Sequence, residues 1–222
     1  MTHEHHDTEH HDDEHHDTDP DYFEPAAWQE RYSGGESVWS GKPNAQLVAE
    51  VSTLTPGTAL DLGCGEGGDV VWLAQQGWQV TGADFSANGL ARAAKHAEEA
   101  GVADRCDWWQ VDARSFDADG RTWDLVSTFF LHPPDHGMAA VVTELAKAVA
   151  PGGHLLVVGH APHPTFQRSA AHEAAMFVAT DLVDAVPEEF EVLVVEQRPR
   201  SVVRDGEQME IHDSTFLARR KA

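Results

Sequence analysis

The sequence predicts an α/β fold: an open, mainly parallel, seven-stranded sheet with helices on both faces and an antiparallel hairpin at its C-terminal end. Short apolar segments alternate with helical segments over most of the chain, as in parallel βαβ units. A glycine-rich turn joins the first strand to a helix, and the last two strands follow each other without a helix. Ligands of such sheets bind at the carboxyl ends of the strands.

The first half of the chain is expected to form three helices and three strands. Glycine commonly follows a helix C-terminus, so Gly77 and Gly101 mark the ends of two helices. Asp84 and Asp112 lie at the ends of the second and third strands. In chain order, we expect a helix over 45–53, a strand over 58–62, a helix over 69–76, a strand over 79–84, a helix over 87–100 and a strand over 106–111.

Turn residues divide the second half in the same way. Pro133 and Pro134 separate a strand from an apolar-periodic helix, and the Ala-Pro-Gly-Gly turn over 150–153 precedes the fifth strand. A polar connection through Asp205 and Gly206 makes the last two strands a hairpin. We expect a strand over 123–129, a helix over 137–149, a strand over 154–159, a helix over 170–185, and strands over 191–197 and 211–219.

The composition favours one cytoplasmic catalytic domain that does not bind nucleic acid. A chain of 222 residues can bury a sizeable core. Its formal charge of −23 opposes binding to phosphate backbones, which favour basic patches. Apolar stretches stay short of the roughly 20 residues that span a bilayer, and the N-terminal residues are acidic, so neither membrane insertion nor secretion is expected. Cys64 and Cys106 lack metal-ligand spacing and are expected to be reduced thiols without a catalytic role.

A histidine-rich, acidic tail over 1–20 precedes an aromatic entrance segment over 21–57 and the main domain over 58–222. The tail has nothing apolar to bury, so we expect it to be disordered. Imidazoles and carboxylates together are ligands for nickel, zinc or copper, and the tail is expected to bind a divalent transition metal. The binding either serves metal handling or is incidental to a solubilising tail. The candidate ligands are His5, His6, His10, His11, His15 and His16.

The run 59–69, Ala-Leu-Asp-Leu-Gly-Cys-Gly-Glu-Gly-Gly-Asp, is the most informative part of the sequence. Its glycines let a nucleotide-like ligand approach the backbone, and Gly63, Gly65 and Gly68 also fit the dinucleotide fingerprint. Asp61 distinguishes a dinucleotide ligand from an aminoacyl sulfonium ligand such as S-adenosylmethionine. A carboxylate before the turn would repel a pyrophosphate at the helix N-terminus, whereas it would attract the ammonium group and positive sulfur of an aminoacyl sulfonium.

Five features together resemble class I S-adenosylmethionine-dependent methyltransferases: the Asp61-x-Gly63-x-Gly65 turn, Asp84, Asp112, the Pro151-Gly152-Gly153 turn and the closing hairpin. The resemblance covers about residues 45–219. It implies a Rossmann-like sheet, S-adenosylmethionine as cofactor and a methyltransferase domain over 58–222. The segment with Trp28, Tyr32, Trp39 and Pro43-Asn44 looks like the entrance region of the tellurite-resistance and thiopurine methyltransferase branch. Its rings either form a flap over a pocket or cap the sheet.

The resemblance also implies which residues bind the cofactor. Asp84 accepts hydrogen bonds from both ribose hydroxyls, Phe85 packs against the adenine ring and Asp112 accepts from the adenine amino group. As alternatives, Asp84 belongs to a surface helix cap and Asp112 is a loop carboxylate. The implied cofactor-binding set is Asp61, Gly63, Cys64, Gly65, Asp84, Phe85, Asp112, Ala113 and Phe129.

Histidines follow the fourth and fifth strands, where a base for the methyl acceptor would lie. His132 and His160 are closest to their strand ends and are the catalytic candidates. An alcohol or ammonium acceptor needs such a base, whereas a thiol or selenol hardly does. As an alternative, these loop histidines are solvated or cap strand ends. The candidate substrate-side residues are Tyr32, Trp39, His136 and His163.

The resulting expectation is methyl transfer to a small-molecule thiol, chalcogen oxyanion or hydroxyl. Two alternatives remain open on the sequence. One is a metal-binding or stress-response protein that uses its histidine-rich tail, and the other is a nicotinamide-dependent oxidoreductase. The oligomeric state is left open.

Overall fold

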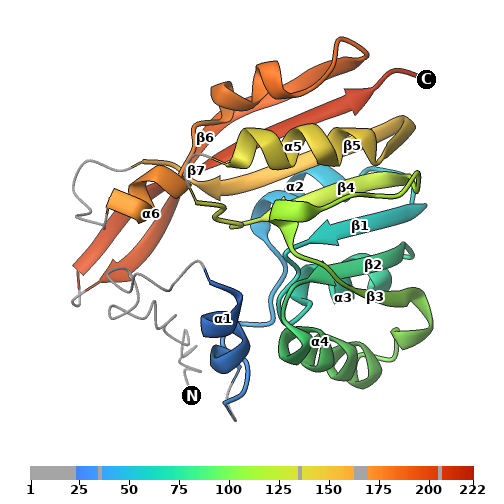
Figure 1. Ribbon diagram of the computed structural model, residues 1–222, viewed down its shortest axis with the longest axis vertical. Coiled ribbons are helices and arrows are strands. Elements are labelled where there is room, and N and C mark those ends of the chain that lie inside the picture. The colour runs from blue at the N-terminus through green and yellow to red at the C-terminus, as the bar shows by residue number, and fades with distance from the viewer. Residues whose placement is uncertain (1–23, 35–36, 135–136, 163–169, 205–206) are drawn as a thin grey trace, which may run out of the picture.

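The computed structural model describes residues 24–34, 37–134, 137–162, 170–204 and 207–222 (Figure 1). The strands are β1 (Thr58–Leu62), β2 (Gln79–Asp84), β3 (Cys106–Gln110), β4 (Trp123–Phe129), β5 (Val149–His160), β6 (Phe190–Arg204) and β7 (Glu207–Arg220). The α-helices are α1 (Pro25–Arg31), α2 (Ala45–Val51), α3 (Gly68–Gln75), α4 (Ala87–Glu99), α5 (Met138–Lys147) and α6 (Ala170–Ala175). Three 3-10 helices are η1 (Ala103–Arg105), η2 (Ala113–Ser115) and η3 (Ala179–Ala185).

All seven strands form one sheet in the order β3-β2-β1-β4-β5-β7-β6. β1 to β5 run parallel to one another, and β7 runs antiparallel to both β5 and β6. The predicted open, Rossmann-like sheet with a closing antiparallel hairpin is therefore confirmed. The predicted tail over 1–20 lies outside the described residues, and so do its six candidate metal ligands.

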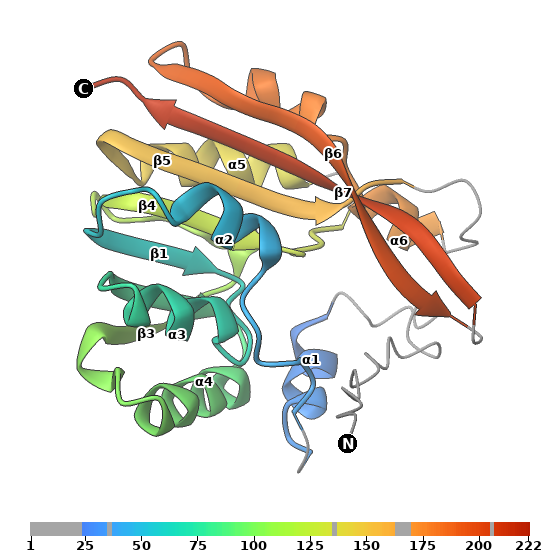
Figure 2. The same ribbon diagram turned by 180° about the vertical axis from the view of Figure 1, so that it is seen from behind.

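One face of the sheet is covered by α2, α3 and α4; in Figure 2, α2 lies in front of β4, and α3 lies below β1. Leu47 of α2, Leu73 of α3 and Ala97 of α4 are fully buried against this face. They pack with Leu125 of β4 and Leu156 of β5, which point to the same side. Burial of these apolar side chains fixes the sheet against its first helical layer.

The opposite face is covered by α5 and η3. Leu145 of α5 and Leu182 of η3 pack with Val126 of β4, Val157 of β5 and Phe216 of β7. Because residues alternate between the two faces along each strand, neighbouring apolar residues in β4 and β5 serve two separate cores. This explains why these strands read as continuous apolar runs rather than as alternating ones.

Local features explain where the helices begin and end. Asn44 caps α2 by accepting a 2.8 Å hydrogen bond from the Gln46 N–H, and Ser86 caps α4 through the Gly89 N–H. Gly77 and Gly101 follow α3 and α4 with φ angles of 100° and 70°, as predicted from sequence. Within the described ranges, each helix is too short or too polar to span a bilayer.

The helix expected over 170–185 is wrong, because α6 ends at Ala175 and a separate 3-10 helix follows from Ala179. Phe177 lies between them and packs over Gly159, where an added Cβ would come within 2.4 Å of the ring. The Phe177 carbonyl accepts a 2.7 Å hydrogen bond from Ser214 Oγ. The chain therefore leaves the helical path at a point where its side chain and its carbonyl are both used by the sheet.

The closing hairpin is longer than the sequence suggested. β7 pairs with β5 over 213–219 only, whereas it pairs with β6 from Arg204↔Glu207 to Phe190↔Arg220. The outer part of the hairpin therefore extends past the carboxyl edge of the sheet, on the side where α1 also lies (Figures 1 and 2). Its polar sequence gave little sign of a strand.

Candidate cofactor and acceptor site

The glycine turn between β1 and α3 has a backbone that only glycine adopts easily. Gly63, Gly65 and Gly67 have φ angles of 80°, 50° and 79°. The N–H groups of Gly63 and Cys64 donate to the Ala83 carbonyl at 2.7 and 3.1 Å, which holds the turn against β2. A Cβ on Gly65 would come within 2.8 Å of the Tyr32 hydroxyl oxygen. The turn is thus shaped for close approach on the side that Tyr32 faces.

Asp61, Asp69 and Asp84 lie around this turn; the carboxylates of Asp61 and Asp84 are buried and that of Asp69 is partly buried. Asp61, at 2% exposure, accepts a 2.9 Å hydrogen bond from Ser127 Oγ. Asp84, at 6% exposure, accepts hydrogen bonds from the backbone N–H groups of Gly65 and Ser86. Asp69, in the first turn of α3, accepts a 2.6 Å hydrogen bond from the Asn44 N–H. Each carboxylate oxygen can accept a further hydrogen bond from a ligand.

Burial makes the ionised forms of these groups unfavourable. It raises the pKa of Asp69 to about 6, and it raises the pKa values of Asp84 and Asp61 above their ordinary range. The negative charge of Asp69 adds to the effect on Asp61. A ligand with an ammonium group and a sulfonium would offset this charge, whereas a pyrophosphate would add to it. This set of carboxylates therefore fits S-adenosylmethionine.

Cys64 lies in the turn between two of its glycines. Burial raises the pKa of the Cys64 thiol well above its usual value, and the charges of Asp84 and Asp61 raise it further. A thiol with a raised pKa is a poor nucleophile. That Cys64 has no catalytic role stays a prediction.

Asp112, the acid that follows β3, is partly exposed and is paired with an arginine, unlike Asp84 at the end of β2. Its carboxylate forms a 2.7 Å ion pair with Arg114 and caps η2 by accepting from the Arg114 N–H. The Arg114 hydrogen bonds hold the pKa of Asp112 below its usual value. Ala113 is buried beside it, and Phe85 lies next to Asp84, where its carbonyl accepts from Gln110 Nε2. Phe129 is partly buried at the end of β4.

The entrance segment lies over the glycine turn. Trp39 Nε1 donates a 3.0 Å hydrogen bond to the Tyr32 hydroxyl, and Trp28 stacks on Trp39 with ring centroids 5.9 Å apart. Tyr32 is buried and Trp39 is half exposed. The buried Glu66 carboxylate accepts hydrogen bonds from the backbone N–H of Trp39 and pairs with Arg92. Tyr32 and Trp39 therefore lie against the turn at Gly65.

The two catalytic candidates lie side by side at the carboxyl edge. The rings of His132 and His160 stack with centroids 5.3 Å apart, although 28 positions separate them in the chain. Leu131, next to His132, would be 3.2 Å from a Cβ on Gly63, so this loop borders the glycine turn. His136 and His163 lie outside the described residues.

Several polar residues of the site were missed by sequence reasoning. Glu66 and Asp69 lie in the glycine-rich run itself, but their roles depend on Trp39 and Asn44, which are distant in sequence. Asp213 lies 3.4 Å from His160, and Arg200 donates to Asp213 at 3.0 Å. The weak sign in the sequence is that Asp213 lies on the last expected strand, over 211–219, directly after His212.

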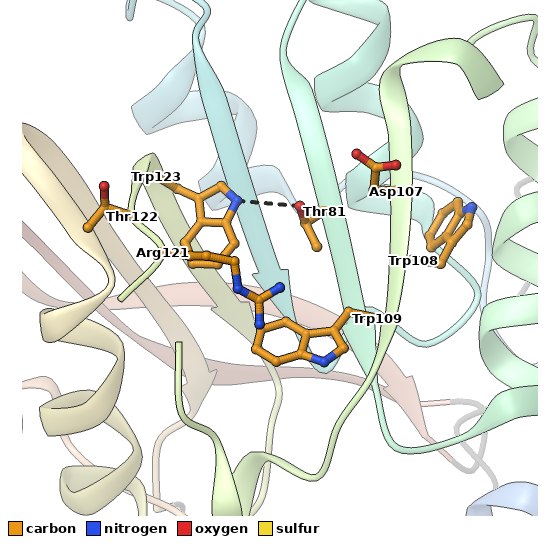
Figure 3. A pocket seen from close by; sticks show the side chains of 7 residues that line it. All are labelled: Thr81, Asp107, Trp108, Trp109, Arg121, Thr122 and Trp123. Carbon is orange, nitrogen blue, oxygen red and sulfur yellow. Dashed lines mark hydrogen bonds between the residues drawn. The ribbon is translucent and has the colours of Figure 1, made fainter. Parts of the chain in front are cut away.

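A separate surface cleft of about 480 Å³ lies near the beginnings of β2, β3 and β4 (Figure 3). The Arg121 guanidinium lies over the Trp109 ring, 3.7 Å from its centroid, and Trp123 Nε1 donates to Thr81 Oγ1. The glycine turn follows the carboxyl end of β1, so this cleft, which lies toward the other ends of the strands, is distinct from the site at the glycine turn. Within the described part of the chain, no group of three or more histidine, cysteine or acidic side chains is placed to hold a metal ion.

Comparison of sequences identifies the family. Residues 59–153 match a family model described as a methyltransferase domain. The chain is 30% identical to phosphatidylethanolamine N-methyltransferase of Cereibacter sphaeroides over 73% of its own length and 82% of that protein's. It is 38% identical to a ubiquinone biosynthesis O-methyltransferase of Serratia proteamaculans, over 44% of this chain and 40% of that one. It is 31% identical to ribosomal RNA small subunit methyltransferase C of Alcanivorax borkumensis, over 50% and 35%.

Solved structures share the fold at low sequence identity. One comes from work on the conversion of a disulfide bond into a thioacetal group during echinomycin biosynthesis (TM-score 0.68, 23% identity, 90% of this chain and 91% of that one). TehB from Haemophilus influenzae has a TM-score of 0.64 at 19% identity, over 90% and 66%.

Magnesium protoporphyrin IX methyltransferase from Synechocystis, with bound S-adenosylmethionine, has a TM-score of 0.52 at 19% identity, over 90% and 80%. The matches give no support to a nicotinamide-dependent oxidoreductase or to a metal-binding protein with a secondary fold. With the acid-flanked glycine turn, the sheet order and these relatives all in agreement, the chain belongs to the class I S-adenosylmethionine-dependent methyltransferases.

Proposed function

We propose that this methyltransferase acts on a small-molecule acceptor with a hydroxyl, thiol or chalcogen oxyanion group. The position of Leu131 against the glycine turn at Gly63 carries the proposal, because it brings the loop with His132, which stacks on His160, beside the turn that would hold the cofactor. An acceptor bound beside these rings would be close to both the cofactor and a base. Effective alignment of this kind supplies much of the catalysis in a group transfer.

The cofactor brings an activated methyl group, so the protein's own task is to bind, align and exclude water. Asp61 would face the positive end of the cofactor and Asp84 the ribose hydroxyls. Phe85, Asp112, Ala113 and Phe129 would surround the adenine, with Asp112 still able to accept a hydrogen bond beside Arg114. Gly63, Cys64 and Gly65 would contribute backbone to the same site.

Tyr32 and Trp39 would close the site from above. Their position over Gly65 favours contact with the cofactor side of the pocket as well as with an acceptor. A covered site excludes water from the transfer. His136 and His163 remain candidates for the acceptor side on sequence grounds alone.

For a hydroxyl acceptor, a histidine would accept the proton that the oxygen loses as it takes the methyl group. Such general base catalysis contributes about 10²–10⁴-fold. A thiol is partly ionised near its pKa of about 8.5 and needs little help. Whether a histidine base is needed therefore depends on the acceptor atom: an oxygen needs it, and a sulfur does not.

A primary amine is the rival acceptor, because phosphatidylethanolamine N-methyltransferase matches over most of its length. RNA is disfavoured, although one relative is a ribosomal RNA methyltransferase, because a formal charge of −23 would repel a phosphate backbone. An acceptor panel separates these classes. Transfer of label from S-[methyl-³H]adenosylmethionine is measured to catechol, 2-mercaptoethanol, tellurite, phosphatidylethanolamine vesicles and ribosomal RNA.

Label in catechol, thiol or tellurite product supports the proposal. Label only in lipid or RNA would overturn it. Calorimetric titration with S-adenosylhomocysteine and with NAD, run in parallel, tests the cofactor separately from the acceptor. We expect heat from the first ligand and none from the second.

The tail would bind a divalent transition metal independently of methyl transfer. His5, His6, His10, His11, His15 and His16 supply imidazoles at high local concentration, with carboxylates between them. This mixture suits nickel, zinc or copper. Metal binding would either serve metal handling or be incidental to a solubilising tail. Deleting the tail tests whether it contributes to methyl transfer.

A further inference from the structure

Sheet register brings a buried acid to one of the two candidate bases. His160 is the last residue of β5, and its Cα partner across the antiparallel pair with β7 is Asp213. Asp213 is 3% exposed, and its Oδ1 lies 3.4 Å from His160 Nδ1. A one-residue slip between β5 and β7 would turn the carboxylate to the other face of the sheet. The contact is therefore built into the strand pairing.

Arg200 of β6 holds this carboxylate from the other side. Its Nε donates to Asp213 Oδ2 at 3.0 Å, and its terminal nitrogen lies 3.5 Å from Oδ1 and from His160 Nδ1. The guanidinium carbon also lies 5.6 Å from the centroid of the Phe130 ring. A guanidinium only donates hydrogen bonds, and its 3.0 Å contact with Asp213 Oδ2 is shorter than its 3.5 Å contact with His160 Nδ1.

Aromatic rings fix the plane of His160. Phe130 packs on the His160 ring with centroids 4.5 Å apart, and His132 stacks on it at 5.3 Å. The His160 side chain is still 22% exposed, whereas His132 Nε2 is buried. The His160 ring is thus packed between two aromatic neighbours and keeps part of its surface exposed.

We infer that Asp213, clamped by Arg200, is a positioning residue that sets the tautomer of His160, which makes His160 rather than His132 the base toward a hydroxyl acceptor. The inference rests on the proposed function for its consequence in catalysis. A carboxylate only accepts hydrogen bonds, so it favours a proton on His160 Nδ1. Nε2 is then left with a lone pair, which can take the proton of the acceptor.

Asp213→Asn tests this by reversing the hydrogen-bond polarity with little change of shape. Arg200 needs an acceptor, so it would orient the new amide oxygen toward itself and the amide NH₂ toward His160 Nδ1. That contact requires Nδ1 to accept, which moves the proton to Nε2 and removes the base. Glu210→Gln is the matched control, because Glu210 lies 3.9 Å from the half-exposed His212 on the same strand.

The readout is the nitrogen chemical shifts of the full-length protein labelled with [¹⁵N]histidine at pH 8, with His160 assigned from the spectrum of His160→Gln. We expect the Nδ1–H tautomer in the wild type and in E210Q, and the Nε2–H tautomer in D213N. Finding Nε2–H in the wild type overturns the inference even if D213N fails to fold. Unchanged tautomers in a folded D213N overturn it as well.

Methyl transfer to catechol gives the catalytic arm. We expect D213N to lower kcat at least 10-fold while the affinity for S-adenosylhomocysteine stays the same, and E210Q to match the wild type. Full activity of D213N would contradict the positioning role. If the wild type transfers no methyl group to catechol, the hydroxyl acceptor fails, whereas the tautomer result still decides the Asp213 contact.

Discussion

Asp84 accepts a 2.9 Å hydrogen bond from the backbone N–H of Gly65, which fastens the end of β2 to the glycine turn. The same carboxylate accepts from the Ser86 N–H at 2.8 Å, and Ser86 rather than Asp84 caps α4. Asp84 is buried, so the alternative of a surface cap does not describe it. One side chain thus shapes the turn and still has acceptor positions for a ligand.

Replacing Asp84 with alanine should weaken cofactor binding. The change removes the acceptor of the Gly65 N–H and the proposed acceptor of the ribose hydroxyls, and buried groups left unpaired cost about 1–3 kcal/mol. Calorimetric titration with S-adenosylhomocysteine measures this. Asp107→Ala is the control, because Asp107 is an exposed acid on the adjacent strand. Equal affinities for all three proteins would remove Asp84 from the cofactor site.

Asp69 should make stability depend on pH. Burial raises its pKa to about 6, so the folded protein holds this proton more tightly than the unfolded chain, whose carboxyl has a pKa of about 3.9. The stability gained from protonated Asp69 is complete below pH 4 and is lost as the pH rises through about 6. Asp69→Asn keeps an acceptor for the Asn44 N–H and removes the titration.

The free energies of unfolding of the wild type and D69N are compared by urea denaturation at pH 4.5 and 7.5. Between these two pH values the stability of D69N relative to the wild type should rise by about 2 kcal/mol, because one unit of pKa corresponds to about 1.4 kcal/mol and part of the linkage already lies below pH 4.5. A constant difference between the two proteins would show that Asp69 titrates normally.

Glu66 should control the closure of the entrance segment. Its carboxylate binds the Val38 and Trp39 N–H groups and pairs with Arg92, so Glu66→Gln should release this segment from the turn. Chymotrypsin should then cut E66Q at Trp39 faster than the wild type, and S-adenosylhomocysteine should protect the wild type. Glu98→Gln on the exposed side of α4 is the control. Equal cleavage with and without ligand would argue against a cover.

The tail should bind nickel or zinc tightly at pH values above 6.5 and weakly at pH values below 6.5, because imidazole must be neutral to coordinate a metal. Deleting residues 1–20 should abolish the binding seen by calorimetry and leave affinity for S-adenosylhomocysteine unchanged. Loss of methyl transfer in the truncated protein would instead make the tail part of the enzyme.

The parts of the site that sequence predicted are local. A glycine in a left-handed turn and an acid at a strand end are encoded by a few adjacent residues, and Gly63, Gly65 and Asp84 lie where the pattern placed them. The pairing of His160 with Asp213 depends on the register between β5 and β7, 53 positions apart. Registers of this range are set by packing of the whole sheet, so the sequence singled out His160 without its partner.

The helices and strands likewise divide into those encoded by adjacent residues and those that depend on distant parts of the chain. Apolar runs and closing glycines predicted the parallel strands and the helices between them within a few residues, except that β5 begins at Val149 and includes the turn expected over 150–153. The break at Phe177 was not visible, because it depends on the space above Gly159 and on the Ser214 hydroxyl from another strand. Likewise, the outer residues of β6 and β7 pair only with each other, outside the register with β5.

The pH dependence of single-turnover methyl transfer to catechol, in the wild type and in His160→Ala, tests the central claim most directly. A histidine base predicts that the wild-type rate rises through about pH 6.5 and that H160A is about 100-fold slower with unchanged affinity for S-adenosylhomocysteine. A rate that does not change with pH, together with full activity of H160A, would contradict the account.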